Sequence, residues 1–99
     1  MTKKYKLGFS WFAKEQLDES MDYYNQKKEG LGYEFWKEII AKADKIEQNP
    51  YQFPKSDFGT RKATLKRFPF RIFYRIKEIY IEVIAVLHHS RDTKELEKE

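Results

Sequence analysis

The sequence predicts a single α+β domain in which an antiparallel helix hairpin packs on one face of a twisted antiparallel sheet. Three observations support this prediction. Apolar residues recur twice at helical spacing between residues 10 and 48, and three strand-like segments follow one another after residue 60. A short alternating segment also precedes the first helix. The expected order is therefore β-α-α-β-β-β, and the 99 residues allow one domain over 1–99.

The first half of the chain contains the N-terminal strand and both predicted helices. In residues 4–9, KYKLGF alternates polar and apolar side chains, which is typical of a short strand. Ser10 suits a helix N-cap, and a helical stripe follows it: Ala13, Leu17, Met21 and Tyr24. The GLG segment at 30–32 ends that helix. A second stripe then runs up to the Asn-Pro pair at 49–50: Leu31, Phe35, Ile39, Ala43 and Ile46.

The second half predicts a loop and a three-stranded meander. Residues 51–60 contain proline and glycine and are expected to form a loop. Strand signals follow at about 61–67, 70–77 and 79–87, and connections this short require antiparallel pairing. Over its second half the last of these strands is apolar at odd and at even positions alike, which indicates a central strand covered on at least part of both faces. The polar tail from residue 90 is expected to form a last helical turn with a frayed end.

Composition excludes several classes of protein. The absence of cysteine rules out disulfides and thiolate metal sites. No run of apolar residues approaches the length of a membrane span, and the N-terminus lacks the features of a secretion signal. A cytoplasmic protein without a membrane, cofactor or metal requirement is therefore expected.

Positive charge is concentrated in the second half of the chain. Residues 1–50 hold nine basic and nine acidic side chains, whereas residues 51–99 hold eleven and seven. The segment 61–77 alone carries seven of the twenty Lys and Arg residues and no acidic residue. Such segregation attracts polyanions, most obviously nucleic acid. Alternatively, these cations protect exposed strands against aggregation.

Alternation along the basic strand sorts its side chains into two faces. One face, expected to meet the helices, carries Phe70, Ile72, Tyr74 and Ile76. On the other face, several cations would surround one aromatic ring, where phosphates could be neutralised and a base could stack. Because like charges on neighbouring strands destabilise a sheet, this arrangement favours a functional explanation. The predicted nucleic-acid-binding residues are Lys62, Lys66, Arg71, Phe73 and Arg75.

Several motifs in this order resemble the RelE/ParE superfamily of type II toxin–antitoxin toxins. They are a YY pair late in the first helix, then GLGYEF, IEQNPYQFP, FPFRIFYRI and VIAVLHHSRD. The resemblance implies a small bacterial toxin of the plasmid-stabilisation kind that inhibits growth. It also implies a cognate antitoxin protein that lays an extended or helical segment across a groove of the toxin.

The resemblance leaves two targets open. ParE-like members inhibit DNA gyrase without cutting nucleic acid, whereas RelE-like members are endonucleases that cut mRNA on the ribosome. The basic residues of the RelE-like pattern fall on Lys62, Arg71 and Arg91. Two departures stand out: Thr64 occupies the second basic position, and acidic sequence around Glu97 replaces a C-terminal tyrosine. The missing tyrosine favours ParE-like action.

His88 and His89 keep the nuclease hypothesis open, because histidine transfers protons near neutral pH and both stand close to Arg91. The candidate catalytic residues of that hypothesis are Lys62, Arg71, His88, His89 and Arg91. In the alternative interpretation, one histidine packs in the core and the other is solvated. A metal site is not expected, since no third ligand is evident. A third hypothesis is a non-toxic nucleic-acid-binding protein, and a dimer is one assembly consistent with the sequence.

Overall fold

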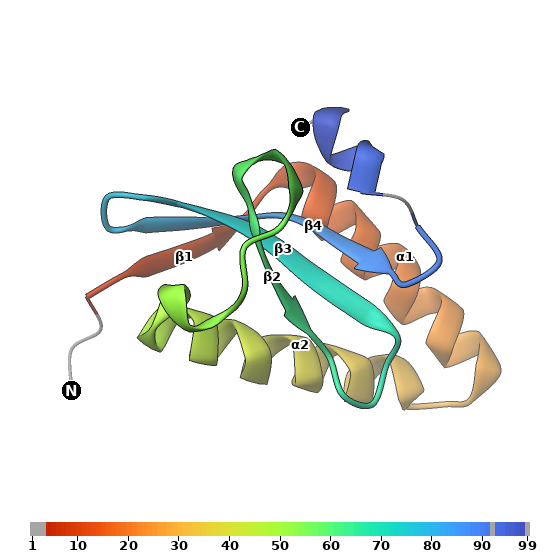
Figure 1. Cartoon of the computed structure of the whole chain (residues 1–99). Helices are drawn as coiled ribbons and strands as arrows, with labels where there is room; N and C mark the ends of the chain where they lie inside the picture. The colour runs from red at the N-terminus through yellow and green to blue at the C-terminus, as the bar shows by residue number, and fades with distance from the viewer. Residues whose placement is uncertain (1–3, 92, 99) are drawn as a thin grey trace.

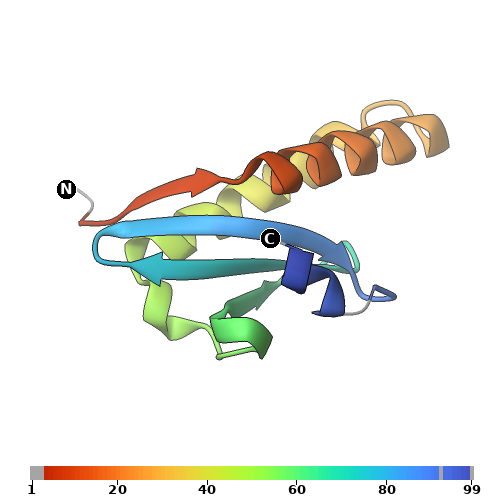
Figure 2. The same cartoon turned by 90° about the horizontal axis from the view of Figure 1, so that it is seen from above.

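Two long helices lie on one face of a four-stranded sheet, and the end of the chain lies against the other face (Figure 1, Figure 2). The structure is a computed structural model that describes residues 4–91 and 93–98. Its helices are α1 (Trp11–Lys27) and α2 (Leu31–Gln48), with three 3-10 helices: η1 (Pro50–Gln52), η2 (Asp57–Gly59) and η3 (Thr93–Lys98). Its strands are β1 (Lys6–Phe9), β2 (Arg61–Thr64), β3 (Phe70–Lys77) and β4 (Tyr80–His88). This order confirms the predicted α+β fold.

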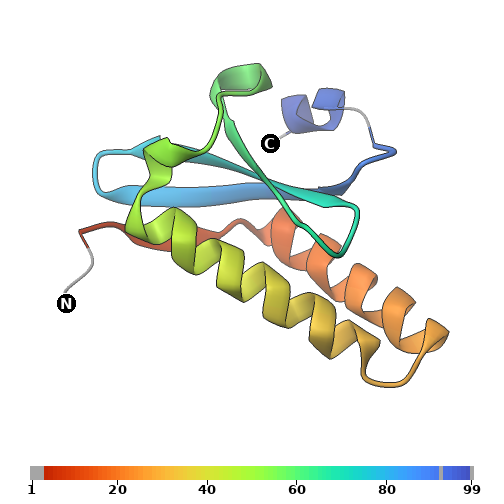
Figure 3. The ribbon, with the colours of Figure 1, turned by 60° about the horizontal axis from the view of Figure 1, so that its bottom comes forward.

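Local sequence signals explain where α1 starts and how closely the helices approach. The Ser10 hydroxyl accepts a hydrogen bond from the Ala13 N–H at 3.1 Å, as expected of an N-cap. The two helices run side by side as a hairpin (Figure 3). At Gly32 an added Cβ would lie only 2.4 Å from the Met21 carbonyl oxygen. The Gly32 N–H also donates to Asn25 Oδ1 at 2.8 Å, so this glycine fixes the contact between the helices.

The sheet has the strand order β1-β4-β3-β2 and is mixed. β2 pairs antiparallel with β3, and β3 pairs antiparallel with β4, because short turns join these strands. β1 instead pairs parallel with β4, to which no turn connects it. The outer edge of β1 is protected, since the Leu7 N–H donates to the Glu47 carboxylate of α2 at 3.0 Å.

A β-bulge in β4 supplies both faces of the sheet with apolar side chains. Tyr74 pairs with Val83 and Phe73 pairs with Ala85, which leaves Ile84 as the extra residue. Val83 joins the main core under the helices, whereas Ile84 and Ala85 both join a second cluster on the opposite face. The prediction of a central strand covered on both faces is confirmed.

The tail of the chain covers part of the face turned away from the helices, called here the far face. Leu96 of η3 is fully buried in the second cluster. The Thr93 hydroxyl donates to the Asp57 carboxylate at 2.7 Å, which joins η3 to η2 over the sheet. The tail is thus helical as predicted, but it also packs against the sheet, which its polar sequence did not indicate.

Candidate functional site

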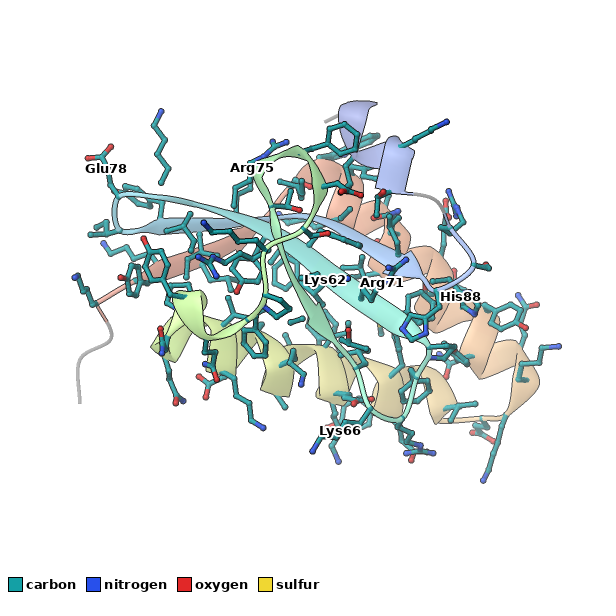
Figure 4. All side chains as sticks on the ribbon, viewed as in Figure 1. Lys62, Lys66, Arg71, Arg75, Glu78 and His88 are labelled. Atoms are coloured by element: carbon teal, nitrogen blue, oxygen red, sulfur yellow. The ribbon has the colours of Figure 1, made fainter. Side chains whose placement is uncertain are left out.

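Lys62 and Arg71 lie on the far face, on neighbouring strands (Figure 4). Lys62 pairs with Phe73 across β2 and β3, and Arg71 pairs with Thr64. The intervening pair, Ala63 and Ile72, belongs to the core beneath the helices. Because side chains alternate along a strand, both cations point away from the helices, as the sequence predicted.

Arg71 is half-buried and lacks a carboxylate partner among the described residues. Its guanidinium carbon lies 5.4 Å from the centre of the Phe73 ring, and Nη2 donates to the Arg91 carbonyl oxygen at 3.4 Å. Its Nε is buried without a hydrogen-bond partner. A partly desolvated guanidinium with unused donors suits an anion such as phosphate or carboxylate.

Phe73 does not form part of the open surface. Its ring is fully buried in the second cluster, where Leu96 packs against the same apolar group. The expectation of an exposed ring available for base stacking is therefore wrong in this conformation. The cause is the η3 segment, whose one apolar residue, Leu96, packs beside Phe73 although the polar sequence of the tail did not indicate it.

The remaining predicted nucleic-acid-binding residues lie at separate places (Figure 4). Lys66 follows the end of β2, and its N–H donates to the Glu38 carboxylate of α2 at 2.8 Å. This carboxylate also accepts from the Arg67 N–H, so β2 ends at Thr64 and not at residue 67 as predicted. Arg75 lies toward the other end of β3, with its Nη2 3.2 Å from the Phe58 carbonyl oxygen.

His88 lies on the helix-facing side of the sheet, opposite to Arg71. It pairs with Phe70, a core residue, and the two rings meet edge to face at 5.3 Å. Nδ1 accepts the Ser90 N–H at 3.0 Å and also contacts the Ser90 hydroxyl at 2.8 Å. A neutral ring in this arrangement carries its proton on Nε2. His88 is therefore oriented by the turn that follows β4.

His89 and Arg91 follow β4 and are both exposed. The His89 N–H donates to the Pro69 carbonyl at 2.8 Å, which extends the ladder by one residue. Arg91 contributes to a groove on the helix-facing side, while its carbonyl oxygen meets Arg71. The structure thus brings Lys62 and Arg71 together on the far face and places His88 and part of Arg91 along the groove. The side chain of Glu97 lies outside the described part.

The groove, of about 440 Å³, runs between α1 and the end of β4. Its aromatic wall includes Tyr23, Tyr24 and Phe70, and burial, followed by the neighbouring Tyr23, raises the pKa of Tyr24. Gln16 of α1 accepts the Val86 N–H at 2.8 Å, at the β4 edge that β1 does not reach. The family resemblance implied a groove for the antitoxin without placing it, and Tyr23 and Tyr24, the YY pair of the sequence, line the groove that the structure contains.

Neither a metal site nor a membrane span is found in the described part of the chain. Residues 4–91 and 93–98 contain no group of three His, Cys, Asp or Glu side chains placed to hold a metal ion. None of the helices in these ranges combines the length and the apolar composition needed to cross a bilayer.

Comparisons with known proteins identify the class of this fold. Residues 8–93 match the family described as "ParE toxin of type II toxin-antitoxin system, parDE". A solved structure described as "Chromosomal ParDE TA system from P. aeruginosa" superposes with a TM-score of 0.77 at 22% identity. That match covers 88% of this chain and 98% of the other. No curated protein matches the sequence.

The fold and the family match define a toxin of the RelE/ParE superfamily. Within that superfamily, the chain belongs to the ParE toxin family of type II toxin–antitoxin systems. The predicted superfamily and toxin role are confirmed, and a ParDE system implies a cognate ParD antitoxin as partner.

Proposed function

We propose that this toxin arrests growth by inhibiting DNA gyrase in the cytoplasm and does not cut mRNA. The observation that supports this proposal most directly is the separation of Arg71 from His88 by the sheet. Arg71 pairs with Leu87 of the second cluster, whereas His88, the next residue of β4, packs on Phe70 of the main core.

RNA cleavage through the 2′-hydroxyl requires a base, an acid and cations around a single phosphate. Lys62 and Arg71 provide cations on the far face, but the oriented histidine faces the other way. His89 is exposed, and no described residue forms a hydrogen bond with its ring. A general base must be held within reach of the proton that it removes, so this arrangement does not favour a nuclease.

On this proposal the far-face pair, Lys62 and Arg71, contacts an acidic group of the target. The Arg71 guanidinium is held by Phe73 and the Arg91 carbonyl, and its free donors suit a carboxylate. Replacing Arg71 with alanine would remove this interaction without disturbing the core beneath β3, because the side chain is outside the main cluster.

We further propose that the groove between α1 and β4 receives the antitoxin. Its aromatic wall suits an apolar side chain, and the exposed Tyr23 ring at its rim offers additional contact area. Pairing with the β4 edge beyond β1 would first require Gln16 to release the Val86 N–H, so side-chain contacts within the groove carry this proposal. Binding of this type would hold α1 and β4 together and cover His88.

The test is to induce the wild-type chain and measure DNA supercoiling and translation in parallel. We expect loss of gyrase supercoiling before any loss of translation, and the same inhibition with purified gyrase. Arg71→Ala should weaken inhibition, whereas Lys14→Ala, an exposed control on α1, should not. Cleavage of mRNA in a ribosomal extract that disappears in Arg71→Ala would overturn the proposal in favour of an endonuclease. Normal growth under full induction would instead indicate a non-toxic binding protein.

A further inference from the structure

One half of the far face is left uncovered by η2 and η3, at the end where the β3–β4 hairpin lies (Figure 2). The pairing of β1, β4 and β3 places two rows of side chains there. Lys6, Tyr80 and Lys77 form one row, and Gly8, Glu82 and Arg75 form the next. The two rows form a distal basic surface, which consists of Lys6, Gly8, Arg75, Lys77, Tyr80 and Glu82.

This surface surrounds a shallow hollow of about 520 Å³. Gly8 lies in the hollow, and a Cβ added there would meet nothing within 4 Å. Gly8 also has no positive φ, so neither packing nor backbone geometry requires a glycine. Glycine inside a strand weakens it and often marks a place where a ligand approaches closely.

The charges of the distal basic surface are mostly positive. Lys6, Arg75 and Lys77 face a single acidic side chain, Glu82. β2 pairs with β3 only between Arg71 and Tyr74, so Arg75 and Lys77 stand where β3 has β4 on one side alone, and their charges also protect this open stretch of edge. Lys6, Arg75 and Lys77 nevertheless converge from two strands on one hollow, and Arg75 keeps further donors besides the Nη2 that binds the Phe58 carbonyl.

An exposed aromatic ring lies within the same group. Tyr80 is 57% exposed and pairs with Lys6 on one side and Lys77 on the other. Its hydroxyl has no hydrogen-bond partner among the described residues. An exposed ring between two lysines resembles the stacking platforms that bind unpaired bases.

We propose that the distal basic surface binds single-stranded nucleic acid, with phosphates on Lys6, Arg75 and Lys77 and a base on Tyr80 above Gly8. An acidic peptide would satisfy the cations but would use neither the flat ring nor the hollow. Single-stranded nucleic acid would use all three, because its phosphates neutralise the cations and one of its bases stacks on the ring above the hollow. This inference goes beyond gyrase inhibition and does not depend on it, because it concerns a different end of the sheet from Arg71.

The first test follows fluorescence anisotropy of labelled oligothymidylate and oligouridylate titrated with the full chain at several salt concentrations. Three phosphate contacts on a single strand predict a log–log salt slope of about −2. The triple variant Lys6→Gln, Arg75→Gln, Lys77→Gln should abolish most of this slope. A control with the same change of charge on the helices should retain it: Lys14→Gln, Lys37→Gln and Lys45→Gln. Equal losses in the two triple variants would overturn the proposal, since binding would then follow net charge alone.

Two single variants test the ring and the hollow. Tyr80→Ala should weaken binding at least about 5-fold, with an unchanged salt slope, because stacking is lost and no phosphate contact is removed. Gly8→Val should block the hollow while the fold remains intact, because the site has room for a side chain and valine suits a strand. Thermal melting verifies that both variants fold.

A labelled poly-glutamate peptide distinguishes the competing partner. Weak peptide binding that Tyr80→Ala leaves unchanged would support the proposal. Peptide binding as tight as that of the oligonucleotides, with neither ligand affected by Tyr80→Ala or Gly8→Val, would overturn it. The oligothymidylate and oligouridylate titrations compare a DNA strand with an RNA strand, and binding of either one supports the proposal.

Discussion

Gly32 is the residue at which the two helices come closest. An alanine there would place its Cβ 2.4 Å from the Met21 carbonyl oxygen and 2.7 Å from the Asn25 side chain. We expect Gly32→Ala to lower the free energy of unfolding by about 1–3 kcal/mol, although alanine favours a helix. Urea denaturation measures the change. Gly8→Ala is the matched control, because its Cβ has open space. Equal losses in the two variants would contradict the expectation.

Tyr74 couples the stability of the core to alkaline pH. It is fully buried, and its hydroxyl donates to the Pro50 carbonyl at 2.6 Å. Burial, opposed in part by the positive charge of Arg61, raises the pKa of Tyr74 to about 12. An unfolded tyrosine releases its proton near pH 10. The stabilising effect of the neutral hydroxyl is therefore complete below about pH 10 and is lost as the pH rises toward 12.

The comparison with Tyr74→Phe isolates this effect. Near neutral pH the variant should be about 1–2 kcal/mol less stable, because the Pro50 carbonyl loses its hydrogen bond. Above about pH 10 the difference should shrink, since only the wild type loses stability through this hydroxyl. Urea midpoints measured from pH 8 to 12 test both statements. A difference that does not vary with pH would show that Tyr74 titrates normally.

At the scale of an element, the start of α1 is tied to β4. The Ser10 hydroxyl caps the helix and also donates to the Ile84 carbonyl at 3.1 Å. Ser10→Ala removes both bonds and should cost about 1–2 kcal/mol of stability, measured by thermal or urea unfolding. Ser20→Ala, within the body of α1, should change stability by much less. If both variants unfold at the same temperature or urea concentration as the wild type, the cap contributes nothing to stability.

The helices and most strands were predictable from sequence because their patterns are local. Ser10 and the apolar stripes mark both helices, and alternation in β3 separates Ile72 from Arg71 correctly. In β4 every residue from Val83 to Leu87 is apolar, so alternation could not reveal the bulge at Ile84. The early end of β2 depends on Glu38, a residue far away in the sequence, whose carboxylate binds the turn.

At the scale of the whole molecule, the tail functions as a cover for the far face. Leu96→Ala should destabilise the protein by about 2–4 kcal/mol, because it leaves a cavity beside Phe73 and Leu87. Urea denaturation would measure this loss. Ile79→Ala, at a site 38% exposed, is the control and should have a smaller effect. Similar stability in all three proteins would mean that the tail does not hold the second cluster.

The same cover explains why the candidate site was only partly predictable. The alternation of side chains along β2 and β3 correctly assigned Lys62 and Arg71 to one face of the sheet. It could not show that Leu96 would bury Phe73. Sequence spacing also could not show that His88 would face the helices, because the bulge changes the parity of β4 before that residue. Long-range packing and one extra residue therefore decided which side chains remained available.

The parallel pairing of β1 with β4 has a consequence for the synthesis of this toxin. β1 is synthesised early, but the strand with which it pairs, β4, is encoded near the other end of the gene. The hydrogen bond from Ser10, directly after β1, to Ile84 of β4 spans 74 positions of the sequence. A nascent chain cannot complete its sheet until β4 has emerged from the ribosome. A product released before that point lacks β4 and cannot complete the sheet at all. Prematurely terminated translation products should therefore be harmless to the cell that makes them.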